Sequence, residues 1–404
     1  MNKNVPKLRF KEFNDEWESH ILESFLEFYT TNSLSRDCLN MNKGEVNNIH
    51  YGDIHMKFPT ILDVQSADIP FINNDIDISK FKSENYCKDG DLIIADASED
   101  YNDIGKAIEI QNIEENKVVA GLHTILARDI KGITADNFKG YMMLNESVRK
   151  QIKILAVGSK VLGISKANLS KVKVNIPSLE EQEKIADFFT IIDRLIEEQE
   201  GKVRDLELYK KCMMQKIFKQ EIRFKDDNGL DYPNWEEKKL SEIVNISKGQ
   251  QLNKENFIPD GKYYVLNGGV NPSGYTNEYN VERETISISE GGNSCGFVNY
   301  NKEKFWSGGH CYTLELKSNE ICNLYLFEVL KYKECSIMNL RVGTGLPNIQ
   351  KPALSKFKVR IPCLEEQEKI ATMLFNIDNI VEEENKKLED LRQLKKGLLQ
   401  QMFV

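Results

Sequence analysis

The stretch IPSLEEQEKIA, residues Ile176–Ala186, returns as IPCLEEQEKIA, residues Ile361–Ala371, with a single position changed. The second copy begins 185 residues after the first. The match extends without a gap over Val157–Phe218 and Val342–Phe403, where about half of the positions are identical. Self-similarity on this scale indicates a duplicated structural unit and not a short shared motif.

The start of each repeated segment carries a helix signal. Pro177 is followed by Ser178 and, three residues later, by Glu181, which is a capping-box pattern, and the acidic residues of this first turn suit the helix dipole. The second copy has Cys363 where the first has the serine, so we expect a weaker cap there.

Both segments continue with apolar residues at a spacing close to that of a coiled coil. The stripe is interrupted at Gln199 and at the equivalent Glu384, a place where two helices could cross or set their register. About 40 residues at 1.5 Å each give a helix of roughly 60 Å. We expect the two long helices to pack on each other and to run antiparallel.

A shorter repeat precedes each variable part of the chain. LRFKEFNDEW, Leu8–Trp17, matches IRFKDDNGLDYPNW, Ile222–Trp235. The first repeated segment is followed by such a lead, whereas the counterpart for the second segment lies at the N-terminus. This is the order of a circle opened at one point. It predicts that the two chain ends lie close together and that the halves are related by a pseudo-two-fold axis.

The segments between leads and repeats predict mixed α/β globules. Short β-type runs such as Asp91–Asp96 and Thr285–Glu290 lie between glycine- and asparagine-rich turns, and candidate helices span Asn137–Ile152 and Asn323–Ser336. The two globules also share a G-x-H core, at Gly121/His123 and Gly308/His310. The predicted organisation is a lead (1–17), a first head (18–156), a repeated segment with a long helix (157–220), a second lead (221–235), a second head (236–341) and a second repeated segment (342–404).

Composition limits the function classes. The chain has 404 residues, 40% hydrophobic and 29% charged, and it contains no apolar run of membrane-spanning length. Its eight cysteines are scattered without a C-x-x-C pair and its N-terminus lacks a signal-peptide pattern, so we expect a cytoplasmic protein without disulfides or zinc. The net charge of −9 argues against bulk attraction to nucleic acid, but Glu236–Pro362 holds 16 basic and 14 acidic residues and leaves room for a local patch.

Motifs of catalysis are incomplete. GSKVLGIS (Gly158–Ser165) has the glycine spacing of a phosphate-binding loop without its lysine, and NPSGY (Asn271–Tyr275) lacks the second proline of the amino-methyltransferase motif. WEEKK (Trp235–Lys239) has the E-x-K of nucleases without an acidic partner before it. The histidines show no metal-ligand spacing, and His50 and His55 beside Asp53 are typical of a polar loop. The pattern favours binding over catalysis, with no catalytic or metal-ligating residue in this chain.

Two unlike heads on a repeated helical spacer would fix the distance between two recognition events. Duplex DNA suits such a device, because successive major-groove faces on one side lie about 34 Å apart. Polar loops would read bases and basic residues would hold phosphates, although each such residue could equally be an ordinary solvated turn residue. The candidate DNA-binding residues are Ser98, Tyr101, Asn102, Lys106, His123, Ser159, Lys160 and Lys166 in the first half, and Asn293, Ser294, Trp306, His310, Arg341, Thr344 and Lys351 in the second.

Taken together, P-x-L-E-E-Q-x-x-I-A (Pro177–Ala186 and Pro362–Ala371), the preceding G-x-x-x-x-x-I (Gly158–Ile164 and Gly343–Ile349) and the leads ending in tryptophan resemble the specificity subunit of type I restriction-modification enzymes. The resemblance implies an α/β fold with two target-recognition domains separated by an antiparallel coiled coil, each domain binding one half of a bipartite DNA site.

The resemblance also implies partners. Two methyltransferase subunits and two restriction-translocase subunits would dock on this chain, and S-adenosylmethionine, ATP and Mg²⁺ would belong to those partners. The near-identical LEEQEKIA stretches would then present the same docking surface twice. Two other interpretations stay open: a coiled-coil scaffold whose heads bind proteins or peptides, and a fused enzyme with an unrecognised nuclease site.

Overall fold

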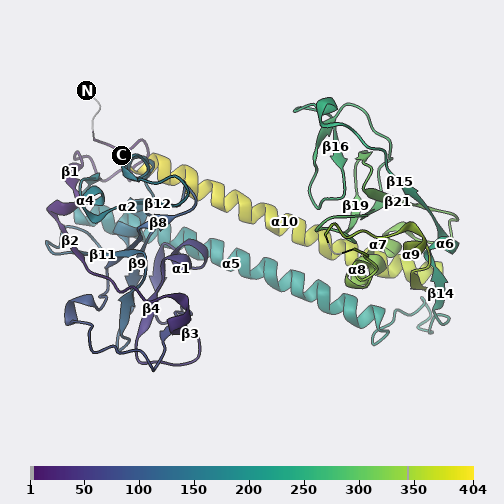
Figure 1. Cartoon of the computed structure of the whole chain (residues 1–404), viewed down its shortest axis with the longest axis horizontal. Coiled ribbons are helices and arrows are strands. Elements are labelled where there is room, and N and C mark those ends of the chain that lie inside the picture. Colours follow the sequence, from purple (N-terminus) through teal and green to yellow (C-terminus); the bar gives the residue numbers. More distant parts are fainter. Residues whose placement is uncertain (1–3, 344) are drawn as a thin grey trace. The chain divides into compact units, whose positions relative to one another are not determined.

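The computed structural model describes residues 4–343 and 345–404. The chain forms two compact units, and each is built from segments that are distant in sequence. Unit 1 comprises Met1–Glu200 with Lys387–Val404, and unit 2 comprises Gly201–Lys386. Each unit therefore contains one head and portions of both long helices, α5 (Leu179–Phe218) and α10 (Leu364–Met402) (Figure 1).

Unit 1 is centred on a five-stranded sheet. Its strand order is β2 (Leu26–Tyr29), β11 (Thr124–Asp129), β7 (Leu92–Ala95), β9 (Ala107–Gln111) and β5 (Ile61–Asp63). Only the β5–β9 pair is parallel. The central strand β7, LIIA, is buried on both faces, which explains its unbroken apolar run.

A smaller sheet and several short helices complete the first head. The small sheet has the order β10 (Val118–Ala120), β4 (Asn47–Ile49), β6 (Phe71–Ile72) and β3 (Leu39–Asn40). The helices are α1 (Tyr51–Met56), α2 (Phe138–Leu144), α3 (Glu146–Leu155) and α4 (Lys166–Leu169). The core lies between the large sheet, α2 and the first turns of α5.

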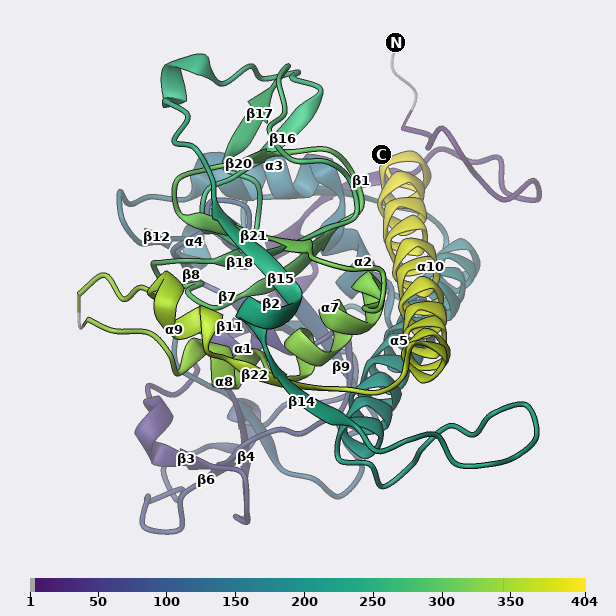
Figure 2. The same ribbon diagram turned by 90° about the vertical axis from the view of Figure 1, so that its right-hand side faces the viewer.

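Unit 2 has a four-stranded antiparallel sheet, β15 (Val244–Lys248), β21 (Cys311–Leu316), β18 (Thr285–Ser289) and β19 (Val298–Asn301). Its helices are α6 (Leu240–Ile243), α7 (Asn323–Tyr332), α8 (Glu334–Met338) and α9 (Lys351–Ser355). A three-stranded sheet, β17 (Gly274–Thr276), β16 (Tyr263–Leu266) and β20 (Trp306–Ser307), extends from one end of the large sheet, whereas α7 lies toward the other (Figure 2).

The two heads share one plan despite their different sequences. The strand order β2-β11-β7-β9 in unit 1 corresponds to β15-β21-β18-β19 in unit 2. Each unit also has a two-stranded antiparallel ladder, β1 (Glu18–Ile21) with β13 (Lys173–Ile176) and β14 (Glu236–Lys239) with β22 (Lys358–Ile361). The mixed α/β class and the internal duplication are confirmed.

The long helices run antiparallel within each unit. In unit 1, Lys395 of α10 pairs with Asp193 of α5. In unit 2, the repeat-equivalent Lys210 of α5 pairs with Asp378 of α10 at 2.6 Å. At the predicted interruption of the apolar stripe, the carboxylate of the buried Glu384 forms an ion pair with Lys202 at 3.0 Å. The antiparallel prediction is confirmed.

The LEEQ core of the repeated stretch is internal. Glu181 and Glu366 are buried, and each binds an arginine of the preceding lead: Arg9 donates to both Glu181 carboxylate oxygens at 2.7 Å, and Arg223 bonds Glu366 in the same way. The neighbouring Gln182 accepts from the Ala135 backbone N–H and donates to the Ile133 and Pro177 carbonyls.

Gln367 repeats this pattern with Cys322, Glu320 and Pro362. The glutamate therefore ties the lead to the helix, and the glutamine ties the head to the helix. This corrects one expectation, because Glu181 is engaged by Arg9 and does not act as the acidic member of a capping box. Internal packing accounts for the repeated Glu and Gln at the buried positions, and docking of partners on the exposed positions stays a prediction.

The predicted closure of the chain is also confirmed. The Leu8 N–H donates to the Gln401 carbonyl at 2.9 Å, and Trp17 packs edge-on against Phe403 at 6.0 Å. In unit 2, Trp235 packs against Phe218, the repeat equivalent of Phe403, at 6.5 Å. Both tryptophans thus seal a lead onto the last turn of a long helix.

Candidate nucleic-acid interface

A tight hairpin opens the repeated segment of unit 1. Val157 and Gly163 exchange two backbone hydrogen bonds of 2.9 and 2.8 Å. Gly158 has φ +136°, and a Cβ at this position would lie 2.1 Å from the Val161 carbonyl oxygen. Only glycine permits this closure.

The same hairpin occurs in unit 2. Val342 and Asn348 exchange bonds of 2.8 and 3.0 Å, and Gly343 has φ +97°. The G-x-x-x-x-x-I pattern is therefore explained by loop geometry: the glycine closes the turn, and the isoleucines Ile164 and Ile349 are buried anchors.

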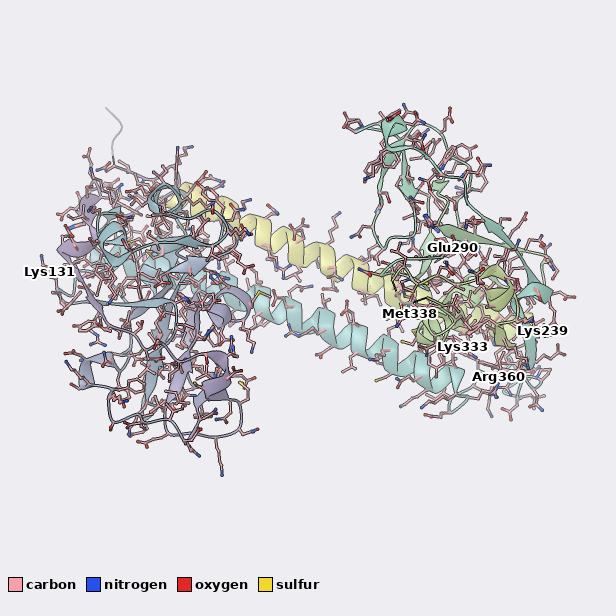
Figure 3. The ribbon with its side chains drawn as sticks, viewed as in Figure 1. Lys131, Lys239, Glu290, Lys333, Met338 and Arg360 are labelled. Atoms are coloured by element: carbon pink, nitrogen blue, oxygen red, sulfur yellow. The ribbon has the colours of Figure 1, made fainter. Side chains whose placement is uncertain are left out.

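Each hairpin is tied to the residue that follows the central strand of its head. The Ile164 N–H donates to the Asp96 carbonyl after β7, and the Ile349 N–H donates to the Glu290 carbonyl after β18, both at 2.8 Å. In unit 2 the Gly292 N–H also donates to the Pro347 carbonyl at 3.0 Å. Figure 3 labels Glu290 where the large sheet meets the β16 extension.

A histidine faces the acidic side chain at this point in both heads. His123 Nδ1 lies 3.2 Å from Asp96 Oδ1, and His310 Nδ1 lies 3.5 Å from Glu290 Oε2. The two histidine side chains are 51% and 62% exposed, so their other ring nitrogens remain accessible. This site recurs at equivalent positions of two heads that otherwise differ in sequence.

The shared glycines position these histidines by allowing close approach. A Cβ on Gly121 would lie 2.4 Å from the Asn48 amide, and one on Gly308 would lie 2.6 Å from the Asn267 amide oxygen. His123 itself has φ +54°, a strained conformation of the kind that clusters at functional sites. The weak G-x-H match in the sequence therefore identifies structurally equivalent positions in the two heads.

Glu290 is held from several sides. Its Oε1 accepts from Lys248 at 2.7 Å and from the Tyr312 hydroxyl at 3.0 Å. Burial and the bond to Glu290 raise the pKa of Tyr312 to about 12, so this hydroxyl stays protonated and donates. Oε2 is buried, lacks a hydrogen-bond partner among the described residues and lies toward His310.

Several predicted site residues carry exposed polar groups. Tyr101 is 53% exposed, and Lys153 lies over its ring while bonding the exposed Asn102 at 2.8 Å. The turn also carries the exposed carboxylate of Glu99, a group type that accepts from cytosine amino groups. The other predicted residues with exposed side chains are Ser159, Lys160, Asn293, Arg341 and Lys351.

Three predicted site residues in unit 1 have internal hydrogen bonds. Ser98 is 5% exposed, and its hydroxyl closes a turn with Asp100. Lys106 donates to the His55 carbonyl at 2.9 Å and Lys166 to the Tyr29 carbonyl at 2.7 Å. Burial lowers the pKa of both lysines. Ser98 is buried, and the two lysines are partly exposed while each is tied to a backbone carbonyl of the head.

Two predicted residues of unit 2 also have internal bonds. The indole N–H of Trp306 donates to the Gln250 carbonyl at 2.8 Å, and the Ser294 carbonyl closes a turn with Phe297. Both are partly exposed. Thr344 lies outside the residues that the structure describes.

Sequence reasoning missed the carboxylates. Asp96 directly follows β7, and Glu290 directly follows β18. The sequence signal for them was an acidic residue after a predicted strand, together with a G-x-H in the same half.

Sequence reasoning also missed a group of cationic side chains in unit 2, on the β14–β22 side away from Glu290 (Figure 3). There Lys239, Lys333 and Arg360 are labelled, and burial lowers the pKa of Lys333, with the neighbouring Arg360 adding to this effect.

Comparison with known proteins places this geometry in a family. The model of the type I restriction modification DNA specificity domain matches twice, over residues 14–207 and 232–393. The chain belongs to this family. Its two matches coincide with the two halves that contain the hairpin and the histidine–carboxylate pair.

Individual relatives agree with the assignment. A type I specificity subunit of Mycoplasma pneumoniae is 35% identical over 172 residues, which are 42% of this chain and 46% of that protein. This chain thus spans less than half the length of that relative. A protein described as the MjaX type I restriction enzyme specificity subunit of Methanocaldococcus jannaschii is 26% identical over 98% of this chain and 95% of its own.

Solved structures share the fold. The S subunit of a type I restriction-modification system from M. genitalium matches with a TM-score of 0.64 at 18% identity over 99% of both chains. A chain from a study of complex assembly and conformational transition of the type I R-M system matches with a TM-score of 0.54 at 14% identity, over 95% of this chain and 96% of its own. These likenesses concern the fold, and this chain itself has two α/β heads and two long helices.

Two further observations concern metal and membrane. Among residues 4–343 and 345–404, no group of three or more His, Cys, Asp and Glu side chains could hold a metal ion. His50 caps α1, and the buried Asp53 inside this helix is bound by Arg36 at 2.7 Å, so the polar loop expected here is wrong and the segment is helical. In the same described residues, no helix has the length and apolarity of a membrane span.

Proposed function

We propose that this chain is the DNA sequence-recognition subunit of a type I restriction-modification complex, in which each head reads one half of a bipartite asymmetric site. The observation that carries the proposal is the recurrence of one polar site, a glycine-closed hairpin beside a histidine–carboxylate pair, once in each unit of a chain of this family. Because the turns around the two sites differ in sequence, each head would read different bases.

The side chains suit the two tasks of DNA recognition. Lys160 in unit 1, and Arg341 and Lys351 in unit 2, are exposed cations beside the hairpins and would hold phosphates. The exposed polar groups of Tyr101, Asn102 and Asn293 would reach base edges. The exposed side chains of His123 and His310 would face a base or a phosphate, and the bond to Asp96 orients His123.

Catalysis belongs to partners in this proposal. Two methyltransferase subunits and two restriction-translocase subunits would dock on the chain in the cytoplasm and would bring S-adenosylmethionine, ATP and Mg²⁺. A chain similar in fold comes from a study of type I R-M complex assembly, which supports docking. The exposed Glu180 and Glu183, repeated as Glu365 and Glu368, would offer the same acidic turn to two copies of one partner.

Salt dependence of binding tests the DNA interpretation. The chain co-purified with its methyltransferase would be titrated with labelled random-sequence duplexes at several salt concentrations. Affinity should fall steeply with salt, and Lys160→Ala or Lys351→Ala should each lower the slope of log affinity against log salt by about one. The control Lys211→Ala, an exposed lysine on α5, should leave the slope unchanged. Salt-independent binding or no binding to duplexes would favour the peptide-binding scaffold.

A further inference from the structure

The hairpins that open the two repeated segments end in exposed apolar side chains. Val161 in unit 1 is 54% exposed and Leu346 in unit 2 is 84% exposed. Single exposed apolar residues are common on protein surfaces. These two occupy the same place in the repeat, 185 residues apart, in loops of identical closure, and the closing residues Val157 and Val342 are exposed as well, at 70% and 54%.

The hairpin holds this side chain on a rigid support. In unit 1 the loop is closed by two backbone bonds between Val157 and Gly163, its last strand β12 (Leu162–Gly163) pairs with β8 (Ala97–Ser98), and Ile164 is buried beneath it. In unit 2, Ile349 plays the same anchoring role. A fixed tip can enter a neighbouring structure without first losing conformational freedom.

The surroundings of each tip are polar and cationic. Lys160 precedes Val161 directly, and Arg341 and Lys351 flank the loop of Leu346. These cations contrast with the net charge of −9 of the whole chain. An exposed apolar side chain beside cations and polar groups fits a polyanion with apolar material inside it, which is the composition of a stacked DNA duplex.

We propose that Val161 and Leu346 are wedges that enter the DNA at each half-site and unstack one base step. This inference rests on the proposed function and extends it to a role for particular side chains. Proteins that deform DNA insert apolar side chains between bases in this way, and unstacking costs least at flexible pyrimidine–purine steps. Each head would thereby select a deformable step in addition to the bases that it contacts.

Local base fluorescence tests the proposal. The probe is a duplex carrying the motif that the intact complex methylates, with 2-aminopurine placed in turn at each purine position except the methylated adenines. The chain would be used as its co-purified complex with the methyltransferase. Wild-type complex should brighten the probe at one step in each half-site, because unstacking relieves quenching.

The variants separate the two heads. Leu346→Ala should abolish brightening in one half-site only and Val161→Ala in the other, with the duplex dissociation constant changed by no more than about threefold. Leu346→Met should retain the signal. The control Leu230→Ala removes a 65% exposed leucine from the second lead and should leave both signals intact.

Each contrary result is informative. If the wild-type complex binds the duplex and no position brightens, or if Leu346→Ala brightens it as wild type does, the wedge is overturned while the proposed function stands. Loss of methyltransferase co-purification in Leu346→Ala would assign the tip to a protein partner and overturn the wedge. Failure of the wild-type complex to bind any duplex would refute the proposed function itself.

Discussion

At the residue scale, the most consequential side chains are the buried ions that join leads to helices. Glu366 is completely buried and accepts from Arg223 at 3.1 and 2.7 Å and from the Trp235 indole at 3.0 Å. A carboxylate without water must be paired, because its desolvation is otherwise uncompensated. The arginine–glutamate pair recurs in each half of the chain, whereas the indole bond is made in unit 2, and the buried Trp17 indole N–H has no partner among the described residues.

Arg223→Ala should destabilise unit 2 by about 3–5 kcal/mol, because it leaves the buried Glu366 carboxylate without its cation. Urea unfolding followed by circular dichroism measures the loss. Arg223→Lys should recover only part of it, since lysine cannot donate the parallel pair of bonds. The control Lys238→Ala removes one partner of a surface pair with Glu236 and should change stability by less than about 1 kcal/mol. Equal effects of the two alanine variants would contradict the account.

A second buried carboxylate predicts a pH effect. Glu328 is 1% exposed, and Lys210 serves both it and Asp378. Burial raises the pKa of Glu328 to about 7 against the opposing effect of Lys210, and Asp378 adds to the rise. Between about pH 4.5 and about pH 7 the folded state therefore binds more protons than the unfolded chain.

The contribution of Glu328 to stability is fully present below about pH 4.5 and is lost as the pH rises through about 7, by up to about 3 kcal/mol. Glu328→Gln should remove this loss, so its stability should exceed that of wild type at pH 8 by more than it does at pH 5. Urea midpoints across this range measure the difference. The exposed control Glu315→Gln should follow the wild-type curve, and a wild-type-like curve for Glu328→Gln would refute the assignment.

Residue roles could be predicted from the sequence only in part. The histidines His123 and His310 were found because a glycine two positions earlier marked both. The internal bonds of Ser98 and Lys106 could not be predicted, because nothing in the sequence of a polar turn distinguishes a side chain that bonds its own head from one that faces outward. Asp96 was missed because its partner lies 27 residues away in the sequence.

At the scale of elements, a glycine-to-alanine substitution should have opposite effects in a hairpin and in a long helix. Gly158→Ala should disrupt the hairpin, because the new Cβ would lie 2.1 Å from a carbonyl oxygen at a positive φ. We expect loss of recognition by one head with helical content retained. Methylation of the wild-type motif by the complex and far-ultraviolet circular dichroism measure these two outcomes.

The matched control is Gly397→Ala in α10, where nothing lies within 4 Å of the new Cβ. It should stabilise the helix by about 0.5–1 kcal/mol and leave recognition intact. Unchanged methylation by Gly158→Ala would show that the hairpin is not part of the reading surface.

Long helices and their direction were predictable because a repeated apolar stripe extends over about 40 residues in each copy. The contacts at the helix starts were less predictable. Ser178 and Glu181 have the spacing of a capping box, but Glu181 forms an ion pair with Arg9, which lies 172 residues away in sequence. The strand order of the heads was not predictable, since short β-type runs do not specify which neighbour each will pair with. The equivalence of the two sheets emerges only from the structure.

At the scale of the whole molecule, each compact unit combines a head with parts of both long helices. Each head and the DNA-binding residues proposed on it therefore belong to one compact unit, and the two units are built on the same plan. We expect replacement of residues 236–341 by the corresponding head of another family member to change one half of the recognised DNA site and to leave the other half unchanged.

Methylation mapping by single-molecule sequencing tests the central claim most directly. Host genomes with the wild-type gene, without it, and with the head-replaced gene would be compared while a matching methyltransferase is expressed. The account predicts a split motif of two short blocks around a fixed gap that appears only with the gene, and a change in one block alone after the replacement. A continuous motif, or a change in both blocks, would contradict the assignment of one half-site to each head.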